Sequence, residues 1–219
     1  NYAMKYQTIL FDLDGTLTDP GEGITRSVAY ALESFGIHVP DRKVLYPFIG
    51  PPLLDSFMEF YGFSEKDARQ AIEKYREYFG KQGIFENELY SGVPEALEEL
   101  KKAGGRLVLA TSKPEPYAKE ILEHFHLMGY FDFVSGSQLD GTRSKKGEVI
   151  AYALGHCGKG AEDKALMVGD RKHDVQGALE NGLPCAGVLY GYGSREELEQ
   201  VGAQWILETP AQLSQLARL

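Results

Sequence analysis

Short apolar runs and amphipathic stripes alternate along most of this chain. Six runs are short and apolar enough to form buried strands, and these are Thr8–Leu13, Arg106–Thr111, Asp132–Ser135, Ala165–Val168, Ala186–Leu189 and the weaker Gln204–Leu207. Between them lie apolar positions at helical spacing, namely Val93/Ala96/Leu97/Leu100, Tyr117/Ile121/Leu122/Phe125 and Val149/Ile150/Ala153/Leu154. Strands that alternate with helices form a parallel sheet covered by helices on both faces. The pattern therefore predicts an α/β fold, a Rossmann-like doubly wound parallel sheet.

Residues 23–83 break this alternation, because every stripe in them has helical spacing. Each of the three stripes ends at a glycine, and they are Ile24/Val28/Ala31/Leu32/Phe35, Leu54/Phe57/Met58/Tyr61 and Ile72/Tyr75/Phe79. We interpret the aromatic residues among them as core rather than as a ligand site. The predicted organisation is an α/β core formed by residues 4–18 and 88–219, with a helical cap domain of residues 19–87 inserted after the first strand. An insertion there is expected above the strand ends, where open α/β sheets bind ligands.

Composition and charge narrow the range of functions. The chain has 219 residues, of which 43% are hydrophobic and 25% charged, as in ordinary globular proteins. A net charge of −9 argues against general binding to nucleic acid or to anionic membranes. No apolar run is long enough to span a membrane, and no signal peptide is visible. Two cysteines, Cys157 and Cys185, suit a reducing compartment, so a cytoplasmic location is expected.

The first strand ends in a pair of carboxylates. Asp12 and Asp14 follow the apolar residues 8–11, and Gly15 comes next. Ionised groups resist leaving water, and two neighbouring carboxylates also repel each other. A divalent cation would compensate both costs, and Gly15 would let the backbone approach a ligand closely. The alternative is an Asp-rich turn with no ligand.

Two further motifs could bind an anion. Thr111 and Ser112 end a buried strand and Pro114 follows, so a helix N-terminus with hydroxyl groups is expected there, which suits a phosphate. An ordinary helix cap is the simpler explanation for these hydroxyl groups taken alone. Lys145 and Lys146 precede the next helical stripe and could neutralise an anionic group, although paired surface lysines are usually only solvated.

The fourth motif follows the strand at residues 165–168. Asp170 comes directly after Gly169, and Asp174 lies four residues further on, about one helical turn away, so both can face the same ion. His173 lies between them, but carboxylates and water suit Mg²⁺ better than imidazole does. Taken alone, the motif is also explained by an aspartate that caps a helix.

In this order, and each at a strand end, the four motifs resemble those of the haloacid dehalogenase superfamily. The resemblance covers the chain after Met4, including the helical insertion. The phosphoglycolate phosphatase and 5′-nucleotidase-like branch is the more similar one, partly through residues 187–194. The resemblance implies a cytoplasmic phosphatase that hydrolyses a small phosphorylated metabolite, binds neither nucleic acid nor membrane, and is a monomer.

The resemblance also implies a role for each motif residue. Asp12 is expected to attack phosphorus and form an aspartyl phosphate, and Asp14 to act as general acid and then as general base. The implied cofactor is Mg²⁺, held by the Asp12 side chain, the Asp14 backbone carbonyl and Asp170, with support from Asp174. The transferred phosphoryl group is expected to bind at Gly15, Thr111 and Ser112. The motif lysine is Lys146 by preference, because it lies nearer the helix start, with Lys145 as the alternative.

Two competing functions remain open. A phosphomutase similar to β-phosphoglucomutase would keep all four motifs but needs a cap that grips a second phosphate, and residues 48–53 lack a basic residue. A non-catalytic binding or regulatory protein on the same scaffold would be expected to have lost a motif, and none is lost. The sequence does not choose between phosphoglycolate and a nucleoside 5′-monophosphate as substrate.

Overall fold

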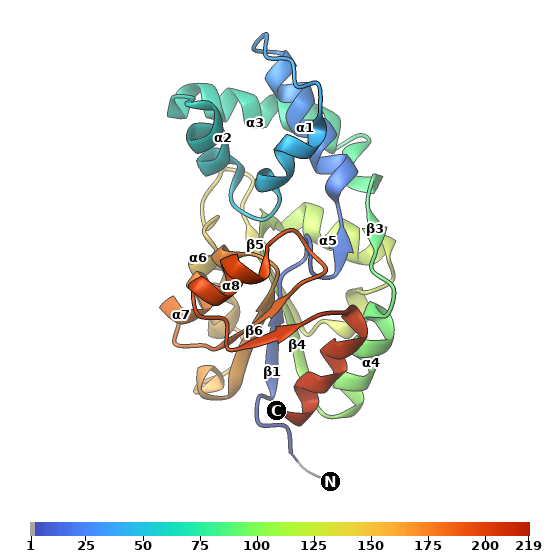
Figure 1. The fold of residues 1–219 in the computed structure, drawn as a ribbon. Helices are drawn as coiled ribbons and strands as arrows, with labels where there is room; N and C mark the ends of the chain where they lie inside the picture. The colour runs from blue at the N-terminus through green and yellow to red at the C-terminus, as the bar shows by residue number, and fades with distance from the viewer. Residues whose placement is uncertain (1–2) are drawn as a thin grey trace. The chain divides into compact units, whose positions relative to one another are not determined.

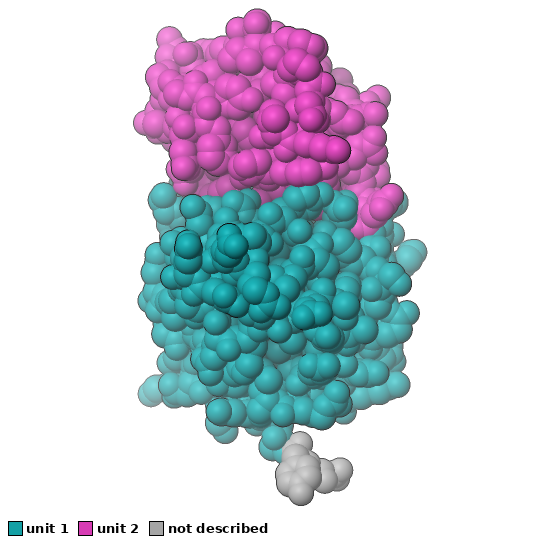
Figure 2. Space-filling view, in the orientation of Figure 1, with its two compact units in different colours: residues 1–19, 89–219 teal, residues 20–88 magenta. Residues whose placement is uncertain are grey.

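The structure is a computed structural model that describes residues 3–219. The described residues form two compact units, shown in different colours in Figure 2. Unit 1 consists of the residues up to Asp19 together with Leu89–Leu219, and unit 2 is Pro20–Glu88. In residues 3–219, no helix combines the length and the apolar composition that crossing a bilayer requires.

Unit 1 is built on a six-stranded parallel sheet with strand order β5-β4-β1-β6-β7-β8 (Figure 1). Its strands are β1 (Thr8–Phe11), β4 (Arg106–Pro114), β5 (Phe133–Ser137), β6 (Ala165–Gly169), β7 (Cys185–Val188) and β8 (Trp205–Leu207). Two shorter strands, β2 (Thr18–Asp19) and β3 (Glu88–Leu89), pair in a separate sheet. All four residues of β1 and all five of β6 are buried, as expected for central strands covered on both faces. The predicted α/β fold with a parallel sheet is confirmed.

Helices cover both faces of this sheet. Figure 1 shows α6 and α7 on one side, and α4 with the 3₁₀ helix η5 on the other. The helices of unit 1 are α4 (Val93–Lys102), α5 (Glu115–His124), α6 (Lys146–Gly155), α7 (Lys172–Glu180) and α8 (Arg195–Gln200), with the 3₁₀ helices η3 (Met128–Tyr130), η4 (Ala161–Lys164) and η5 (Pro210–Arg218). Both cysteines are buried free thiols in the core.

The strand order reverses direction beside β1, the first strand. The chain goes from β1 to β4 and β5 on one side, then crosses to β6, β7 and β8 on the other. Such a reversal leaves a crevice at the carboxyl ends of the strands, where open α/β sheets bind ligands. Asp12 follows β1 at this point.

Unit 2 is helical, as the stripes predicted. It contains α1 (Gly21–Glu33), α2 (Leu53–Tyr61) and α3 (Glu65–Phe79), with the 3₁₀ helices η1 (Arg42–Phe48) and η2 (Gly83–Phe85). Phe57 and Phe79 are fully buried, which agrees with a core role for these aromatic residues. Gly62 ends α2 in the left-handed conformation, and the Ser64 side chain then caps α3 by accepting a hydrogen bond from the backbone N–H of Asp67.

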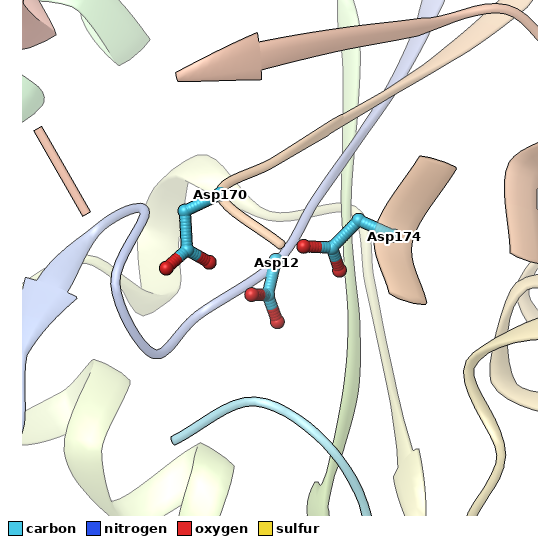
Figure 3. A group of neighbouring side chains, drawn as sticks. All are labelled: Asp12, Asp170 and Asp174. Carbon is cyan, nitrogen blue, oxygen red and sulfur yellow. The ribbon is translucent and has the colours of Figure 1, made fainter. Parts of the chain in front are cut away.

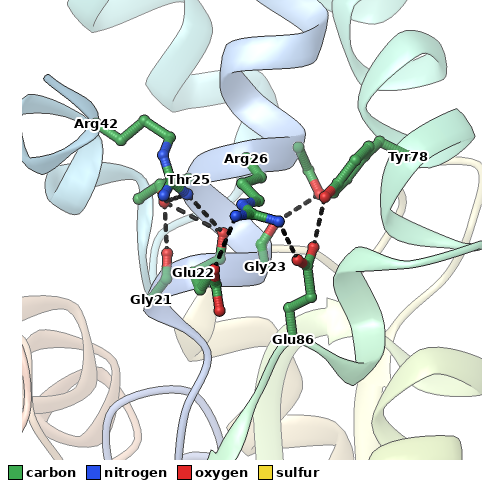
Figure 4. Close-up of polar contacts among 9 residues, drawn as sticks. Gly21, Glu22, Gly23, Thr25, Arg26, Arg42, Tyr78 and Glu86 are labelled. Atoms are coloured by element: carbon green, nitrogen blue, oxygen red, sulfur yellow. Dashed lines mark hydrogen bonds and ion pairs between the residues drawn. The ribbon is translucent and has the colours of Figure 1, made fainter. Parts of the chain in front are cut away.

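A polar network holds the two ends of unit 2 together (Figure 4). The Arg26 guanidinium on α1 lies 2.6 Å from the Glu86 carboxylate, which is close to the end of the unit, and 3.0 Å from Glu22. The Tyr78 hydroxyl donates to the same Glu86 carboxylate at 2.7 Å. Exposed ion pairs stabilise little individually. Here, however, the Glu86 carboxylate contacts both α1 and α3, so it links these two helices to the end of unit 2.

Candidate active site

The register of the parallel sheet brings three of the predicted motifs to one edge. Phe11 in β1 pairs with Leu109 in β4 and with Val168 in β6, so the residues that follow these strands are neighbours. The Asp12 backbone N–H also donates to the Val168 carbonyl at 2.9 Å. Asp12, Thr111 and Asp170 are all buried at this edge.

Lys146, the first residue of α6, completes the cluster. Its side chain is only 3% exposed, and its Nζ lies 2.7 Å from Asp12 Oδ1 and 2.9 Å from Asp174 Oδ1. Nζ also donates to the Ala110 carbonyl at 3.2 Å. Lys145 is exposed and precedes α6 as its N-cap residue. The structure thus places Lys146, rather than Lys145, beside Asp12.

Three buried carboxylates lie together at this edge of the sheet (Figure 3). One oxygen from each of Asp12, Asp170 and Asp174 lies within 4.8 Å of the others. Asp170 accepts a hydrogen bond from the Tyr192 backbone N–H at 2.8 Å, and Asp174 accepts one from the Arg171 N–H at 3.0 Å. These hydrogen bonds fix the orientation of the two carboxylates.

The cluster carries more negative charge than its one ammonium group neutralises. Burial and the neighbouring Asp174 carboxylate raise the pKa of Asp12 to about 7, although Lys146 acts in the opposite direction. Burial and the Asp12 carboxylate also raise the pKa of Asp170. Burial lowers the pKa of Lys146, but Asp12 and Asp174 outweigh this and hold it above its ordinary value. An ion of charge +2 would neutralise the excess.

The donor set fits a hard divalent cation. Asp12 Oδ2 is buried, and within residues 3–219 no hydrogen-bond donor reaches it. Buried carboxylate oxygens without a donor are costly unless a cation coordinates them. Carboxylate oxygens are the ligands that Mg²⁺ prefers, usually one or two of them together with water and a substrate phosphate. Asp12, Asp170 and Asp174 therefore suit such an ion.

Asp14 lies outside this group of three and has a lysine partner of its own. Its Oδ2 is 3.1 Å from Lys113 Nζ, and both side chains are less than one-tenth exposed, at 8% and 6%. Its other oxygen, Oδ1, is buried and accepts no hydrogen bond from the described residues. The sequence singled out Asp14 but gave no sign of its pairing with Lys113.

Gly15 is required by the close approach of Asp170. Its φ is +84°, a value that favours glycine. A Cβ atom at this position would lie 2.1 Å from Asp170 Oδ2, which no side chain allows. The absence of a side chain at residue 15 thus lets the loop after β1 fold over the Asp170 carboxylate.

Thr111 and Ser112 lie in β4, which is longer than predicted. The sequence placed the end of this strand at Thr111, but the strand continues to Pro114 after a register irregularity beyond Ala110. The Thr111 hydroxyl accepts a hydrogen bond from the Lys113 backbone N–H at 3.1 Å. The Ser112 hydroxyl is buried and, within the described part of the chain, has no hydrogen-bond partner. Both hydroxyl groups belong to the cluster at the strand ends, where an anion could bind.

The segment Tyr190–Gly193 after β7 also contributes to the site, although none of the four sequence motifs includes it. The Tyr190 hydroxyl donates to the Thr16 carbonyl at 2.7 Å, and the Tyr192 N–H holds Asp170. A Cβ atom on Gly191 would lie 2.2 Å from the Gly15 carbonyl oxygen. The available signal was the alternating Tyr-Gly-Tyr-Gly pattern directly after a buried strand.

Two charged or titratable residues of the fourth motif have other surroundings. Arg171 Nε pairs with Glu197 Oε2 at 3.0 Å. Burial and the nearby Arg171 lower the pKa of His173 to about 4, so its imidazole is neutral at pH 7. Neither is a member of the three-carboxylate group.

Comparison with known proteins gives matches that span both units. Residues 9–188 match the family model described as haloacid dehalogenase-like hydrolase. A 5′-nucleotidase of Pseudomonas aeruginosa is 53% identical over 196 residues, which cover 90% of this chain and 88% of that protein. The crystal structure of a predicted phosphatase from Clostridium acetobutylicum matches with a TM-score of 0.94 and 51% identity, over 96% of this chain and 97% of that one. The tyrosine-protein kinase PtkA of Mycobacterium tuberculosis is 38% identical over 194 residues, which cover 89% of this chain and 66% of that protein.

Proposed function

Because the chain belongs to the haloacid dehalogenase-like hydrolase family, we propose that it is a Mg²⁺-dependent phosphatase that acts through an aspartyl phosphate on Asp12. The observation that carries this proposal is the difference in contacts between the two oxygens of the Asp12 carboxylate. Lys146 contacts Oδ1, whereas Oδ2 is buried beside two further carboxylates and receives no hydrogen bond from the described residues. A carboxylate held in this way suits nucleophilic attack once the surrounding charge is neutralised.

In this proposal the cation is Mg²⁺, held by Asp12 and Asp170 with the backbone carbonyl of Asp14, and supported by Asp174. Its contribution when bound is to neutralise charge on the carboxylates and on the phosphoryl oxygens. Lys146 keeps Asp12 in position through its 2.7 Å contact and adds a second positive charge beside the phosphoryl group. Asp174 in turn helps to hold Lys146, at 2.9 Å.

The first step transfers the phosphoryl group to the protein. The Asp12 carboxylate forms a bond to phosphorus through one of its oxygens while the bond between phosphorus and the leaving oxygen breaks. Asp14 gives a proton to that oxygen, so the product leaves as a neutral alcohol. The buried Oδ1 of Asp14, which accepts no hydrogen bond from residues 3–219, is the atom available for this proton transfer.

The second step frees Asp12. Asp14 removes a proton from a water molecule, whose oxygen forms a bond to phosphorus while the bond between phosphorus and Asp12 breaks. Thr111 and Ser112, with the backbone near Gly15, bind the phosphoryl oxygens throughout. Positioning and charge neutralisation are the main requirements of phosphoryl transfer.

The proposed substrate class is the nucleoside 5′-monophosphates, with phosphoglycolate as the second choice. Support for this order comes from the 53% identical protein named 5′-nucleotidase, since the phosphoglycolate phosphatases of Colwellia psychrerythraea and Aquifex aeolicus share 26% and 30% identity with this chain. The helical unit Pro20–Glu88 acts in this proposal as the cap that selects the substrate.

Release of inorganic phosphate tests the proposed function. Wild-type protein with Mg²⁺ should hydrolyse p-nitrophenyl phosphate and at least one member of a panel of nucleoside 5′-monophosphates and phosphoglycolate. The Asp12→Asn variant should be inactive on all of them, and EDTA should abolish the wild-type activity. If wild type and Asp12→Asn are equally inactive on the whole panel, a binding or regulatory role is favoured instead.

Phosphoryl transfer to an acceptor other than water is a second candidate function. The 38% identity with proteins named tyrosine-protein kinase favours it. An aspartyl phosphate on Asp12 would serve both reactions, which differ only in the group that attacks phosphorus in the second step. Phosphate that appears on a protein tyrosine, rather than free in solution, would identify this second function.

A further inference from the structure

A pocket of about 460 Å³ opens at the opposite edge of the sheet from the candidate active site. It is formed where β1, β4, β5 and β6 begin, whereas Asp12 and Asp170 lie where β1 and β6 end. Its lining residues all belong to unit 1, and the charged ones are Lys101, Arg106, Asp132, Lys159 and Lys164.

The charge of this pocket is opposite to that of the chain. The chain has a net charge of −9, but the lining contains four cationic side chains and one carboxylate. That carboxylate, Asp132, already accepts hydrogen bonds from Lys101 Nζ at 2.8 Å and from the Leu107 backbone N–H at 3.0 Å. Partial burial would raise the pKa of Asp132, but Lys101 and the Leu107 N–H outweigh it and lower this pKa. Asp132 is thus ionised and paired with Lys101.

Three cationic groups remain once this pair is set aside. The Arg106 guanidinium donates to the Cys157 carbonyl, which fixes the side chain against the wall of the pocket. Lys159 and Lys164, before and at the end of η4, form no ion pair with any carboxylate among residues 3–219. Positive charges gathered in a concave surface attract anions more strongly than the same charges spread over a flat one.

Recognition in this pocket would come from side chains rather than from the backbone. The N–H groups of Gly104, Gly105 and Ala161 are already used in turns, where they donate to the carbonyls of Lys101, Leu100 and Gly158. Ammonium and guanidinium groups bind phosphate oxygens through strong, charge-assisted hydrogen bonds. The volume exceeds what a single phosphate fills and lies in the range of small-molecule sites.

We propose that this pocket binds a small molecule that carries a diphosphate group, at a second site separate from Asp12. Arg106, Lys159 and Lys164 provide positive charge comparable to the negative charge of a diphosphate, and the remaining volume leaves room for an attached group. Inorganic pyrophosphate and a nucleoside diphosphate share this chemistry. The proposal concerns binding and does not depend on which substrate the active site hydrolyses.

Two-dimensional NMR of the full-length, ¹⁵N-labelled protein tests the proposal directly. The first probe is methylenediphosphonate, whose P–C–P bridge cannot be hydrolysed, and the second is the α,β-methylene analogue of ADP. Saturable shifts are expected for the amide signals of Gly104, Gly105 and Gly160. Shifts confined to Gly15 and Ser112 would place the anion in the active site alone and overturn the proposal. If the ADP analogue binds more tightly than methylenediphosphonate, the pocket also recognises the group attached to the diphosphate. If the two probes bind with equal affinity, the pocket recognises the diphosphate alone.

Charge-removal variants provide the second arm of this test. The Lys159→Gln/Lys164→Gln double variant should weaken binding at the Gly160 signal by at least about tenfold. Lys81→Gln/Lys119→Gln, which removes the same charge at exposed positions outside the pocket, should leave that affinity unchanged. Equal affinity of both double variants would contradict the proposed site. Phosphatase activity should be the same in all three proteins, so failure of this proposal is distinguishable from failure of the proposed function.

Discussion

Lys146 shares one ammonium group between the Asp12 and Asp174 carboxylates inside the protein. With distances of 2.7 and 2.9 Å and almost no solvent access, the three side chains act as one electrostatic unit. Removing the cation from such a unit leaves two buried carboxylates without compensation, which costs several kcal/mol. The Lys145 side chain is exposed, so Lys145 is not part of this buried unit.

The two lysines therefore predict different kinetics. Lys146→Met should lower kcat by about 10²-fold or more, because a positive charge beside the phosphoryl group is lost. Lys145→Met should change kcat by less than about threefold, as expected of a surface residue. Steady-state hydrolysis of p-nitrophenyl phosphate, with circular dichroism to verify folding, measures both. The reverse ranking would assign the motif to Lys145.

Asp14 predicts an effect that differs between the two chemical steps. p-Nitrophenolate leaves without a proton, so Asp14→Asn should still release one equivalent of it in a rapid burst. The second step needs a base, so steady-state turnover should fall by about 10²-fold or more. Stopped-flow absorbance under excess substrate separates the burst from turnover. Unchanged steady-state turnover would show that Asp14 is not the proton carrier.

Residue types and spacing predicted most of this cluster, but not the contact between Lys113 and Asp14. Asp12, Thr111 and Asp170 could be predicted because each ends a recognisable apolar strand, and parallel strands share one carboxyl edge. The sequence favoured Lys146 over Lys145 because Lys146 lies nearer the helix start, and the structure places Lys146 beside Asp12 as the first residue of α6. The contact of Lys113 with Asp14 depends on the extension of β4 to Pro114, which no apolar pattern marks.

Among the elements, the turn after β7 supports the site most directly. Gly191 lies where a Cβ atom would be 2.2 Å from the Gly15 carbonyl oxygen and 2.4 Å from Asp170 Cβ. The turn can therefore approach both the loop after β1 and the Asp170 carboxylate only without a side chain at this position. Tyr192 then donates its backbone N–H to Asp170.

Gly191→Ala is predicted to damage this arrangement. The introduced methyl group forces the turn away from Asp170, so the variant should lose about 2 kcal/mol or more of stability and bind Mg²⁺ more weakly. The matched control is Gly155→Ala at the end of α6, where a Cβ would meet no atom of residues 3–219 within 4 Å. That variant should be neutral or more stable by up to about 1 kcal/mol. Chemical denaturation with and without Mg²⁺ measures both effects, and equal stability of the two variants would contradict this role of the turn.

Strand and helix positions followed from periodicity, and their deviations have local causes. All six predicted strands form, because continuous apolar runs bounded by turns identify buried parallel strands well. Residues 42–48 form a 3₁₀ helix rather than a regular α-helix, and Pro47, which lacks an N–H donor, lies inside it. The short pair of β2 and β3 has two residues in each strand, too few for a periodic signal.

At the scale of the whole molecule, the active-site carboxylates link stability to pH and to metal. The pKa of Asp12 rises from 3.8 to about 7 on folding. A carboxyl group whose pKa is raised in this way favours folding at low pH, and this contribution is lost as the pH rises through the folded value. Without a cation, the free energy of unfolding should therefore fall between about pH 4 and pH 7.

Mg²⁺ is accordingly predicted to stabilise the protein more at about pH 8 than at about pH 5, because it binds the ionised carboxylates. For a chain of this length each kcal/mol corresponds to about 2–4 °C in Tm, so the extra stabilisation should be several degrees. Thermal unfolding in EDTA and in Mg²⁺ at both pH values measures it. The Asp170→Asn variant, which lacks one of the proposed ligands, should show a smaller difference. An equal shift in Tm at both pH values would contradict the proposed metal site.

The attachment of phosphate to Asp12 is tested most directly by trapping the covalent intermediate. Protein mixed with p-nitrophenyl phosphate and Mg²⁺ is quenched in acid and reduced with borohydride, which converts an aspartyl phosphate to homoserine. Peptide mass spectrometry should then find homoserine at position 12 in the wild type, and none in Asp12→Asn. Unmodified Asp12 in protein that turns over substrate, or a phosphoryl group on a different residue, would contradict the account.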